Sequence, residues 1–220
     1  VGYINMSERV PEYMRRAYTY LKNGRPSPVL LQLPRGLGEY DLEDFQYHPV
    51  KKWRMGGDEK DVSKAYNALQ NAVKPVILAG QGIFYADACS ELLEFAEITQ
   101  IPVITTLKGK SCFPEDHQLS LGMRGGPVEY YLRTTDLIFT IGYGFNPSHF
   151  AHTIPEPNKK KIIQCTIDPL EINLSYWIDH AIIGDAKIVL NQLIEESKEQ
   201  DKPVQDSSIM AKINDLKQEK

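Results

Sequence analysis

Short runs of consecutive apolar residues alternate along the chain with longer stretches of helical spacing. The runs lie at 75–79, 102–106, 119–123, 136–141, 161–167 and 181–183. Uninterrupted apolar runs, as opposed to alternating apolar and polar positions, are typical of strands covered on both faces. The pattern therefore predicts six buried β-strands.

Amphipathic helices are predicted beside most of these strands. The helix after Asp58 carries the apolar stripe Val62, Ala65, Tyr66, Leu69 and Val73. A second is lined by Ala88, Leu92, Phe95 and Ala96, and a third, after Asp185, by Ala186, Val189, Leu190, Leu193 and Ile194. Asp58 and Asp185 are predicted N-caps, because an aspartate accepts a hydrogen bond from a free N–H of the first turn.

Strands that alternate with helices favour an α/β fold with a parallel sheet. Right-handed crossovers leave few topologies. The sequence predicts a six-stranded, doubly wound parallel sheet with helices on both faces, which is a Rossmann-like arrangement of the DHS-like FAD/NAD-binding type.

The first residues have a different pattern. Ser7 and Pro11 suit a helix start, Asn23-Gly24 a helix end, and 28–33 a buried strand. We expect 1–36 to be a helix–strand remnant of another domain, 37–57 a linker, 58–198 the main domain and 199–220 a second linker. We expect both ends to be either cuts from a longer protein or linkers.

Composition narrows the classes of function. The net charge is −4 and the basic residues form no long run, so nucleic acid and anionic membranes are not expected partners. No apolar stretch approaches the roughly 20 residues of a membrane span, and no signal peptide opens the chain. The three cysteines fit no zinc site, so we expect buried thiols and a cytoplasmic location.

In a doubly wound sheet, ligands bind beyond the carboxyl ends of the strands. Gly80-Gln81-Gly82 follows the first strand and is either a pyrophosphate cradle or a tight strand-to-helix turn. Asp168 and Asp185 are either ribose or adenine acceptors or a turn acid and an N-cap. Lys108, Lys110 and Arg124 are candidate phosphate contacts or solvated loop charges. We expect His117 to be structural, and His48, His149, His152 and His180 have no carboxylate or cysteine at ligand spacing.

Several segments resemble, in order and spacing, the thiamine-diphosphate enzymes of the acetolactate synthase kind. Residues 24–34 look like the closing strand of the pyrimidine-binding domain, and 74–82 like the first strand and turn of the central domain. Pro102–Lys110, Phe113–His117 and Leu121–Met123 resemble the segments that follow, and Asp136–Gly142, Ile167–Ile172 and Gly184–Ala186 complete the series. The resemblance covers about residues 8–195.

The resemblance implies a parent enzyme that decarboxylates a small-molecule 2-oxo acid and transfers the resulting carbanion-like adduct to a proton or a carbonyl. Thiamine diphosphate and Mg²⁺ would be bound mostly outside this chain, and a homodimer or homotetramer is implied. The fragment alone is expected to be inactive, with no catalytic or metal-ligating residue of its own.

For the central domain, the resemblance implies a bound FAD, a bound ADP or an empty structural domain. The implied contacts are Gly80, Gln81, Gly82, Thr106, Leu107, Gly122, Met123, Gly142, Asp168 and Asp185. After Gly142, flavin-binding members usually read Ala-Arg-Phe-Asp-Asp-Arg, where this chain has Tyr143-Gly-Phe-Asn-Pro-Ser148. Each lost charge-assisted hydrogen bond costs roughly 1.5–3 kcal/mol, so two missing arginines weigh against FAD.

Two other functions remain open at this point. The first is a stand-alone, non-catalytic nucleotide-binding module, against which the strand at 28–33 speaks. The second is a structural spacer that sets the geometry between two catalytic domains.

Overall fold

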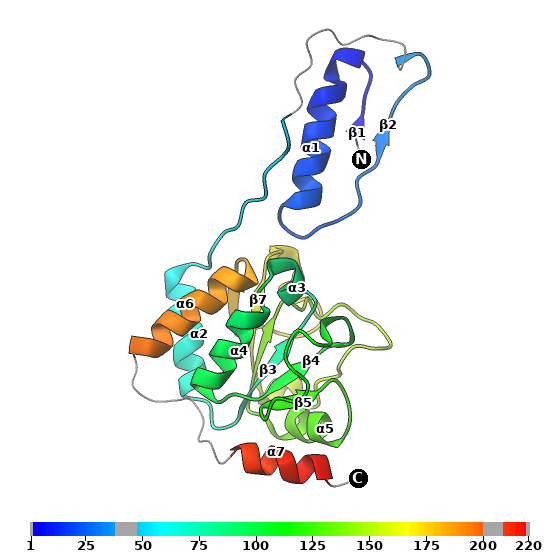
Figure 1. The fold of residues 1–220 in the computed structure, drawn as a ribbon. Coiled ribbons are helices and arrows are strands. Elements are labelled where there is room, and N and C mark those ends of the chain that lie inside the picture. Colours follow the sequence, from blue (N-terminus) through cyan, green and yellow to red (C-terminus); the bar gives the residue numbers. More distant parts are fainter. Residues whose placement is uncertain (1, 38–47, 200–208, 219–220) are drawn as a thin grey trace. The chain divides into compact units, whose positions relative to one another are not determined.

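The computed structural model describes residues 2–37, 48–199 and 209–218. The chain divides into two compact units, Val1–Arg54 and Met55–Lys220. Figure 1 shows both units with their elements labelled. The larger unit contains the predicted sheet.

The sheet of the larger unit has six parallel strands in the order β5-β4-β3-β6-β7-β8. The strands are β3 (Pro75–Ala79), β4 (Val103–Thr105), β5 (Ser120–Gly122), β6 (Leu137–Ile141), β7 (Lys161–Thr166) and β8 (His180–Ile183). The order runs outward in both directions from β3 and β6, which is the doubly wound arrangement that the sequence predicts. The fold prediction is confirmed.

Helices cover both faces of this sheet. The helices are α2 (Glu59–Gln70), α3 (Gly82–Ala86), α4 (Cys89–Thr99), α5 (Gly126–Thr134), α6 (Ala186–Glu199) and α7 (Ile209–Gln218). Helix α6 packs against both α2 and α4, and α7 packs against α5 (Figure 1). Right-handed crossovers explain why helices lie on both faces, because connections that run in opposite directions along a parallel sheet lie on opposite faces.

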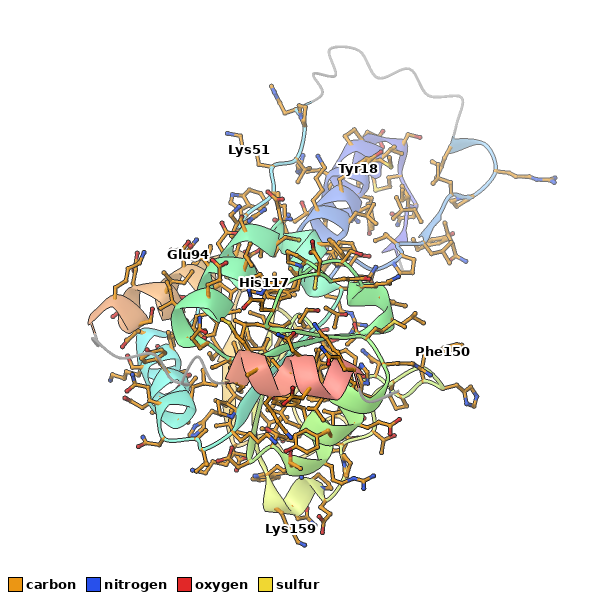
Figure 2. All side chains as sticks on the ribbon, turned by 60° about the horizontal axis from the view of Figure 1, so that its bottom comes forward. Tyr18, Lys51, Glu94, His117, Phe150 and Lys159 are labelled. Atoms are coloured by element: carbon orange, nitrogen blue, oxygen red, sulfur yellow. The ribbon has the colours of Figure 1, made fainter. Side chains whose placement is uncertain are left out.

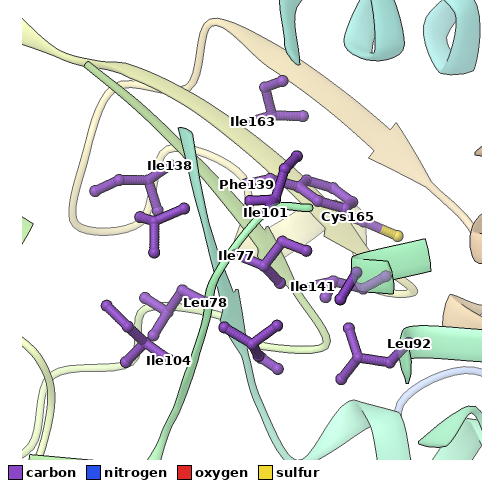
Figure 3. Close-up of a cluster of buried hydrophobic side chains, with 14 of the residues drawn as sticks. Ile77, Leu78, Leu92, Ile101, Ile104, Ile138, Phe139, Ile141, Ile163 and Cys165 are labelled. Atoms are coloured by element: carbon purple, nitrogen blue, oxygen red, sulfur yellow. The ribbon is translucent and has the colours of Figure 1, made fainter. Parts of the chain in front are cut away.

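The core lies along the central strands. Every residue of β3 and β6 is buried, and Ile77 pairs in register with Phe139 (Figure 3). The ring of Phe139 meets that of Phe95 from α4 edge-on, with the ring centres 6.1 Å apart. On the other face, Thr140 of β6 lies beside Gln164 of β7. Both are fully buried, and Thr140 Oγ1 and Gln164 Oε1 have no hydrogen-bond partner within the described residues.

Most of the predicted helix ends are confirmed. Asp58 and Asp185 are N-caps and accept from the N–H groups of Lys60 and Lys187 at 3.0 and 3.1 Å. The stripe of α2 is buried as far as Leu69, but Val73 lies beyond the helix and is 83% exposed, so its place in the stripe is wrong. The predicted second helix is α4, and Ala88 is its N-cap residue. The separate short helix α3 precedes it and ends at Asp87, which has a left-handed backbone.

The segment predicted as a second linker, 199–220, contains α7. Its Ile213 and Leu216 are buried, and the helix packs on α5. A linker has no reason to bury apolar side chains, so 209–218 is part of the larger unit. Within the described residues, no helix combines the length and the apolar character that a membrane crossing requires.

The smaller unit has the predicted helix, α1 (Val10–Lys22), preceded by a short 3₁₀ helix, η1 (Ser7–Arg9). Ser7 does not cap α1, because its hydroxyl donates instead to the carbonyl of Leu37 at 3.3 Å. The predicted strand at 28–33 is reduced to β2 (Leu31–Gln32), which pairs in parallel with β1 (Gly2–Tyr3). Its predicted burial is wrong, because Leu30 and Leu33 are 57% and 52% exposed. The sequence did not predict β1.

The predicted linker 37–57 is divided between the two units, and its residues 38–47 lie outside the described residues. The N–H of Trp53 donates to Asn23 Oδ1 at 2.6 Å in the smaller unit. In the larger unit, the carbonyl of Met55 accepts from the N–H of Asp185 at 2.8 Å. The side-chain amide of Gln192 both accepts from the N–H of Gly57 and donates to its carbonyl, each at 3.0 Å.

Candidate functional site

All ten predicted contact residues lie at one edge of the sheet, beyond the carboxyl ends of its strands. Each follows or ends a strand: Gly80, Gln81 and Gly82 after β3, Thr106 and Leu107 after β4, Gly122 and Met123 at the end of β5, and Gly142, Asp168 and Asp185 after β6, β7 and β8. The parallel topology therefore brings the predicted set together, as expected for a doubly wound sheet.

The turn after β3 requires glycine because the turn after β6 lies directly against its backbone. A Cβ at Gly80 would lie 2.4 Å from the carbonyl oxygen of Gly142, and one at Gly82 would lie 2.6 Å from the Gly142 Cα. Gly142 itself has a φ of 63°, which favours glycine. The two turns touch backbone to backbone.

The N–H groups of this turn donate within the chain. Gly80 N donates to Ile141 O, Gly82 N to Gly142 O and Ile83 N to Gly80 O, at 2.9, 2.9 and 3.2 Å. A phosphate cradle needs such N–H groups free. The geometry therefore supports the tight-turn interpretation of Gly80–Gly82, and the pyrophosphate role stays a prediction that this turn does not favour.

The loop after β4 is also held by its own hydrogen bonds. Thr106 Oγ1 accepts from the N–H of Gly109 at 3.1 Å, and the N–H of Thr106 donates to Ala79 O at 2.9 Å. The Leu107 side chain is 43% exposed. Leu107 thus offers apolar surface, whereas the polar groups of Thr106 are already bonded.

The loop after β5 is more open. Gly122 and Gly125 have positive φ values of 78° and 108°, and a Cβ on either would have no atom within 4 Å. Arg124 between them is exposed, and its guanidinium lies 5.8 Å from the ring centre of Phe150. Figure 2 shows Phe150 at the outer end of its loop. This part of the edge has accessible backbone and one cation.

His152 joins this region and was not predicted. Its Nε2 lies 3.2 Å from the carbonyl oxygen of Thr105, which can only accept, so Nε2 donates. Burial lowers the pKa of His152 below its usual value, and nearby Arg124 lowers it further, while the bond to Thr105 opposes the shift. No spacing along the chain could indicate His152, because it reaches Thr105 across 47 positions.

The two predicted acids serve the local backbone. Asp168 Oδ1 accepts from the N–H of Leu170 at 3.0 Å, which is the turn role, and Asp185, only 3% exposed, caps α6. Their predicted contacts with a ribose or an adenine stay a prediction.

A third acid, Glu171, was not predicted and is more deeply placed than Asp168. It ends the 3₁₀ helix η5 (Pro169–Glu171), and its carboxylate accepts from Thr166 Oγ1 at 2.6 Å and from Asn146 Nδ2 at 3.4 Å. A Cβ at Gly144 would lie 2.1 Å from Glu171 Oε1. The carboxylate is therefore seated directly against the loop that follows β6.

Lys108 and Lys110 lie in the loop after β4, and both side chains are exposed. Lys110 pairs with Glu115 at 3.7 Å. His117 bonds Glu97 at 3.3 Å and accepts from the N–H of Leu119, in agreement with its predicted structural role. A pocket of about 520 Å³ beside His117 is lined by Glu97, Gln100, Asp116, His117, Gln118 and Met210. Five of these residues precede β4 or β5 and Met210 belongs to α7, so this pocket is at the opposite edge of the sheet.

No group of three His, Cys, Asp or Glu side chains in the described part of the chain is arranged to hold a metal ion. The cysteines are free thiols. Burial raises the pKa of Cys112 to about 12 and that of Cys165 still further. The predicted buried thiols are confirmed, with Cys89 half-buried.

Comparisons with known proteins agree with this fold. Residues 62–193 match the family model of the thiamine pyrophosphate enzyme central domain. A protein of Methanocaldococcus jannaschii named "probable acetolactate synthase large subunit" is 38% identical over 205 residues, which cover 87% of this chain and 34% of that protein. Glyoxylate carboligase of Escherichia coli O157:H7 is 34% identical over 200 residues, which cover 88% of this chain and 34% of that protein.

Among solved structures, benzoylformate decarboxylase from Polynucleobacter necessarius superposes with a TM-score of 0.73 at 25% identity, covering 88% of this chain and 37% of that one. The chain spans about a third of the length of the curated relatives that it matches. The match covers the whole six-stranded sheet together with most of α2 and the first part of α6. The chain therefore belongs to the thiamine pyrophosphate enzyme family, in which it corresponds to the central domain.

Proposed function

We propose that this chain is the central domain of a thiamine-diphosphate-dependent 2-oxo acid decarboxylase or carboligase that resembles acetolactate synthase. The observation that carries the proposal is the family match over residues 62–193, which spans the sheet from β3 to β8. Relatives named acetolactate synthase and glyoxylate carboligase support the choice of reaction class.

The contribution of this chain is structural. At the carboxyl edge, Asp168 and Asp185 cap backbone N–H groups, and the glycines pack two turns together. Thiamine diphosphate and Mg²⁺ would supply the electron sink that decarboxylation requires, and we propose that parts of the parent outside this chain hold them. We propose a homodimer or homotetramer for the parent, and a 2-oxo acid as its small-molecule substrate.

The test compares this chain with the protein encoded by its full reading frame. Both are assayed for CO₂ release from pyruvate and glyoxylate with thiamine diphosphate and Mg²⁺. We expect turnover by the full protein and none by the chain alone. Turnover by the chain alone contradicts the structural role, and a full protein that binds no thiamine diphosphate contradicts the proposal as a whole.

FAD or ADP could bind in this domain, and the loop after β5 and the turn after β3 differ in how well they suit such a ligand. The backbone at Gly122–Gly126 is open and lies beside the cation of Arg124, whereas the N–H groups of Gly80, Gly82 and Ile83 are bonded within the chain. Retained flavin absorbance after soaking in FAD and gel filtration, with ADP titrated calorimetrically, separates the possibilities. Binding of either ligand, with no longer protein found in cells, would favour the alternative, a stand-alone nucleotide-binding module.

A further inference from the structure

The loop that follows β6 is fixed in place by side chains from β7 and the segment after it. The carbonyl of Tyr143 accepts from Gln164 Nε2 at 3.3 Å, and the carbonyl of Phe145 accepts from Ser175 Oγ at 2.7 Å. Asn146 donates to Glu171. Residues 143–146 are thus bonded by three side chains, those of Gln164, Glu171 and Ser175.

The backbone of this loop is strained. Phe145 has a φ of 52°, a left-handed conformation that costs a non-glycine residue of this size about 1–2 kcal/mol. Its ring is buried, with the rings of Tyr143 and Tyr176 each 5.0 Å away. Such a conformation persists only where the surroundings enforce it, so the contacts of the loop determine its shape.

Glu171 provides the tightest of these contacts. Thr166 Oγ1 accepts from the N–H of Asp168 at 3.2 Å, so its single hydroxyl proton is free to be donated to Glu171 Oε2. With Asn146 Nδ2, two polar donors converge on one carboxylate at the carboxyl ends of β6 and β7. Hydroxyl and amide donors at this edge of a doubly wound sheet are the groups that a ligand's anionic oxygens would use.

We propose that the Glu171 carboxylate is an internal anion that occupies these donors in place of a ligand phosphate. It fixes the 143–146 loop and closes this part of the edge to the diphosphate of a nucleotide. Gly144 is part of the same arrangement, because any side chain at that position would meet Glu171 Oε1. A diphosphate brought to this place would meet a buried negative charge and find its donors taken.

The test is chemical rescue of thermal stability in the full chain. Glu171→Ala leaves a carboxylate-sized space with two donors, and we expect its Tm to fall by about 4–8 °C. Acetate at about 100 mM should restore about 3 °C to this variant and none to the unsubstituted chain, with chloride at the same ionic strength as reference. The matched control is Glu195→Ala, an exposed glutamate of α6, whose Tm should change little with or without acetate.

Two further measurements keep the proposal open to refutation if Glu171→Ala does not fold. Gly144→Ala should lower the Tm, and the loss should shrink when it is combined with Glu171→Asp, whose shorter side chain draws the carboxylate away from position 144. ADP and FAD should leave the Tm of the unsubstituted chain unchanged. The proposal is overturned if acetate acts no better than chloride on folded Glu171→Ala, if Gly144→Ala is neutral, or if ADP or FAD stabilises the chain with Glu171 in place.

Discussion

Gly80→Ala tests whether the glycines at the carboxyl edge serve backbone packing. The new Cβ would lie 2.4 Å from the carbonyl oxygen of Gly142 and 2.6 Å from the Cβ of Tyr143. Neither atom can rotate away, because the bond from Gly82 N to Gly142 O holds the two turns together at 2.9 Å. The φ of Gly80 is not in the left-handed region, so the cost is steric and not conformational.

Overpacking of a close contact typically costs about 1–3 kcal/mol, and a contact with backbone on both sides belongs to the upper part of that range. We expect a loss of about 2–3 kcal/mol, which corresponds to a fall in Tm of about 4–12 °C for a chain of this length. Urea unfolding followed by circular dichroism at 222 nm gives the midpoint, which should fall while the m-value stays constant.

The matched control is Gly126→Ala at the first position of α5. A Cβ there has no atom within 4 Å, and its φ is not positive. Alanine favours helix and restricts the unfolded chain, whereas the following Pro127 disfavours a helical backbone in a residue that has a Cβ. We therefore expect a net change of at most about 1 kcal/mol. Equal midpoints for Gly80→Ala and Gly126→Ala would show that packing between the two turns does not require glycine at position 80. The Gly80–Gly82 turn would then again be a candidate ligand contact.

Three further predictions concern buried polar and titratable groups. Thr140→Val should raise the free energy of unfolding by about 1 kcal/mol, because it replaces a buried hydroxyl that has no partner among the described residues by a methyl group of the same shape; a loss in urea unfolding would show that the hydroxyl is bonded. A thiol reagent at pH 8 should modify at most Cys89 in the folded chain, since burial raises the pKa of Cys112 to about 12, and modification of a second thiol before unfolding contradicts this. Because burial lowers the pKa of His152 in the folded state, its contribution to stability is complete above the unfolded pKa of about 6.5 and is lost as the pH falls. Between pH 7.5 and 5 the unsubstituted chain should therefore lose more Tm than His152→Gln, and parallel pH profiles would argue against a shifted histidine.

The sequence predicted the larger unit well because each of its signals is local. Apolar runs such as 75–79 and N-caps such as Asp58 determine strands and helix starts without reference to distant residues. The handedness of the crossovers then favours a strand order that runs outward from β3 and β6.

The features that the sequence did not predict depend on distant partners. Gly2 and Tyr3 form β1 only because Leu31 and Gln32 offer a neighbouring strand. Glu171 looks like an ordinary turn acid in the sequence, and its burial follows from the absence of a side chain at Gly144. The same holds for His152, whose partner is the backbone of β4.

The paired hydrogen bonds between Gln192 and Gly57 make a side-chain amide stand in for a neighbouring peptide group. A Cβ at Gly57 would lie 2.5 Å from Ile182 Cγ2, so the chain at this point fits tightly between α6 and β8. The entry of the chain into the larger unit is thus determined by residues of that unit. A foreign domain fused upstream of Met55 should therefore leave the sheet intact, which makes this position a suitable junction for building chimeric proteins.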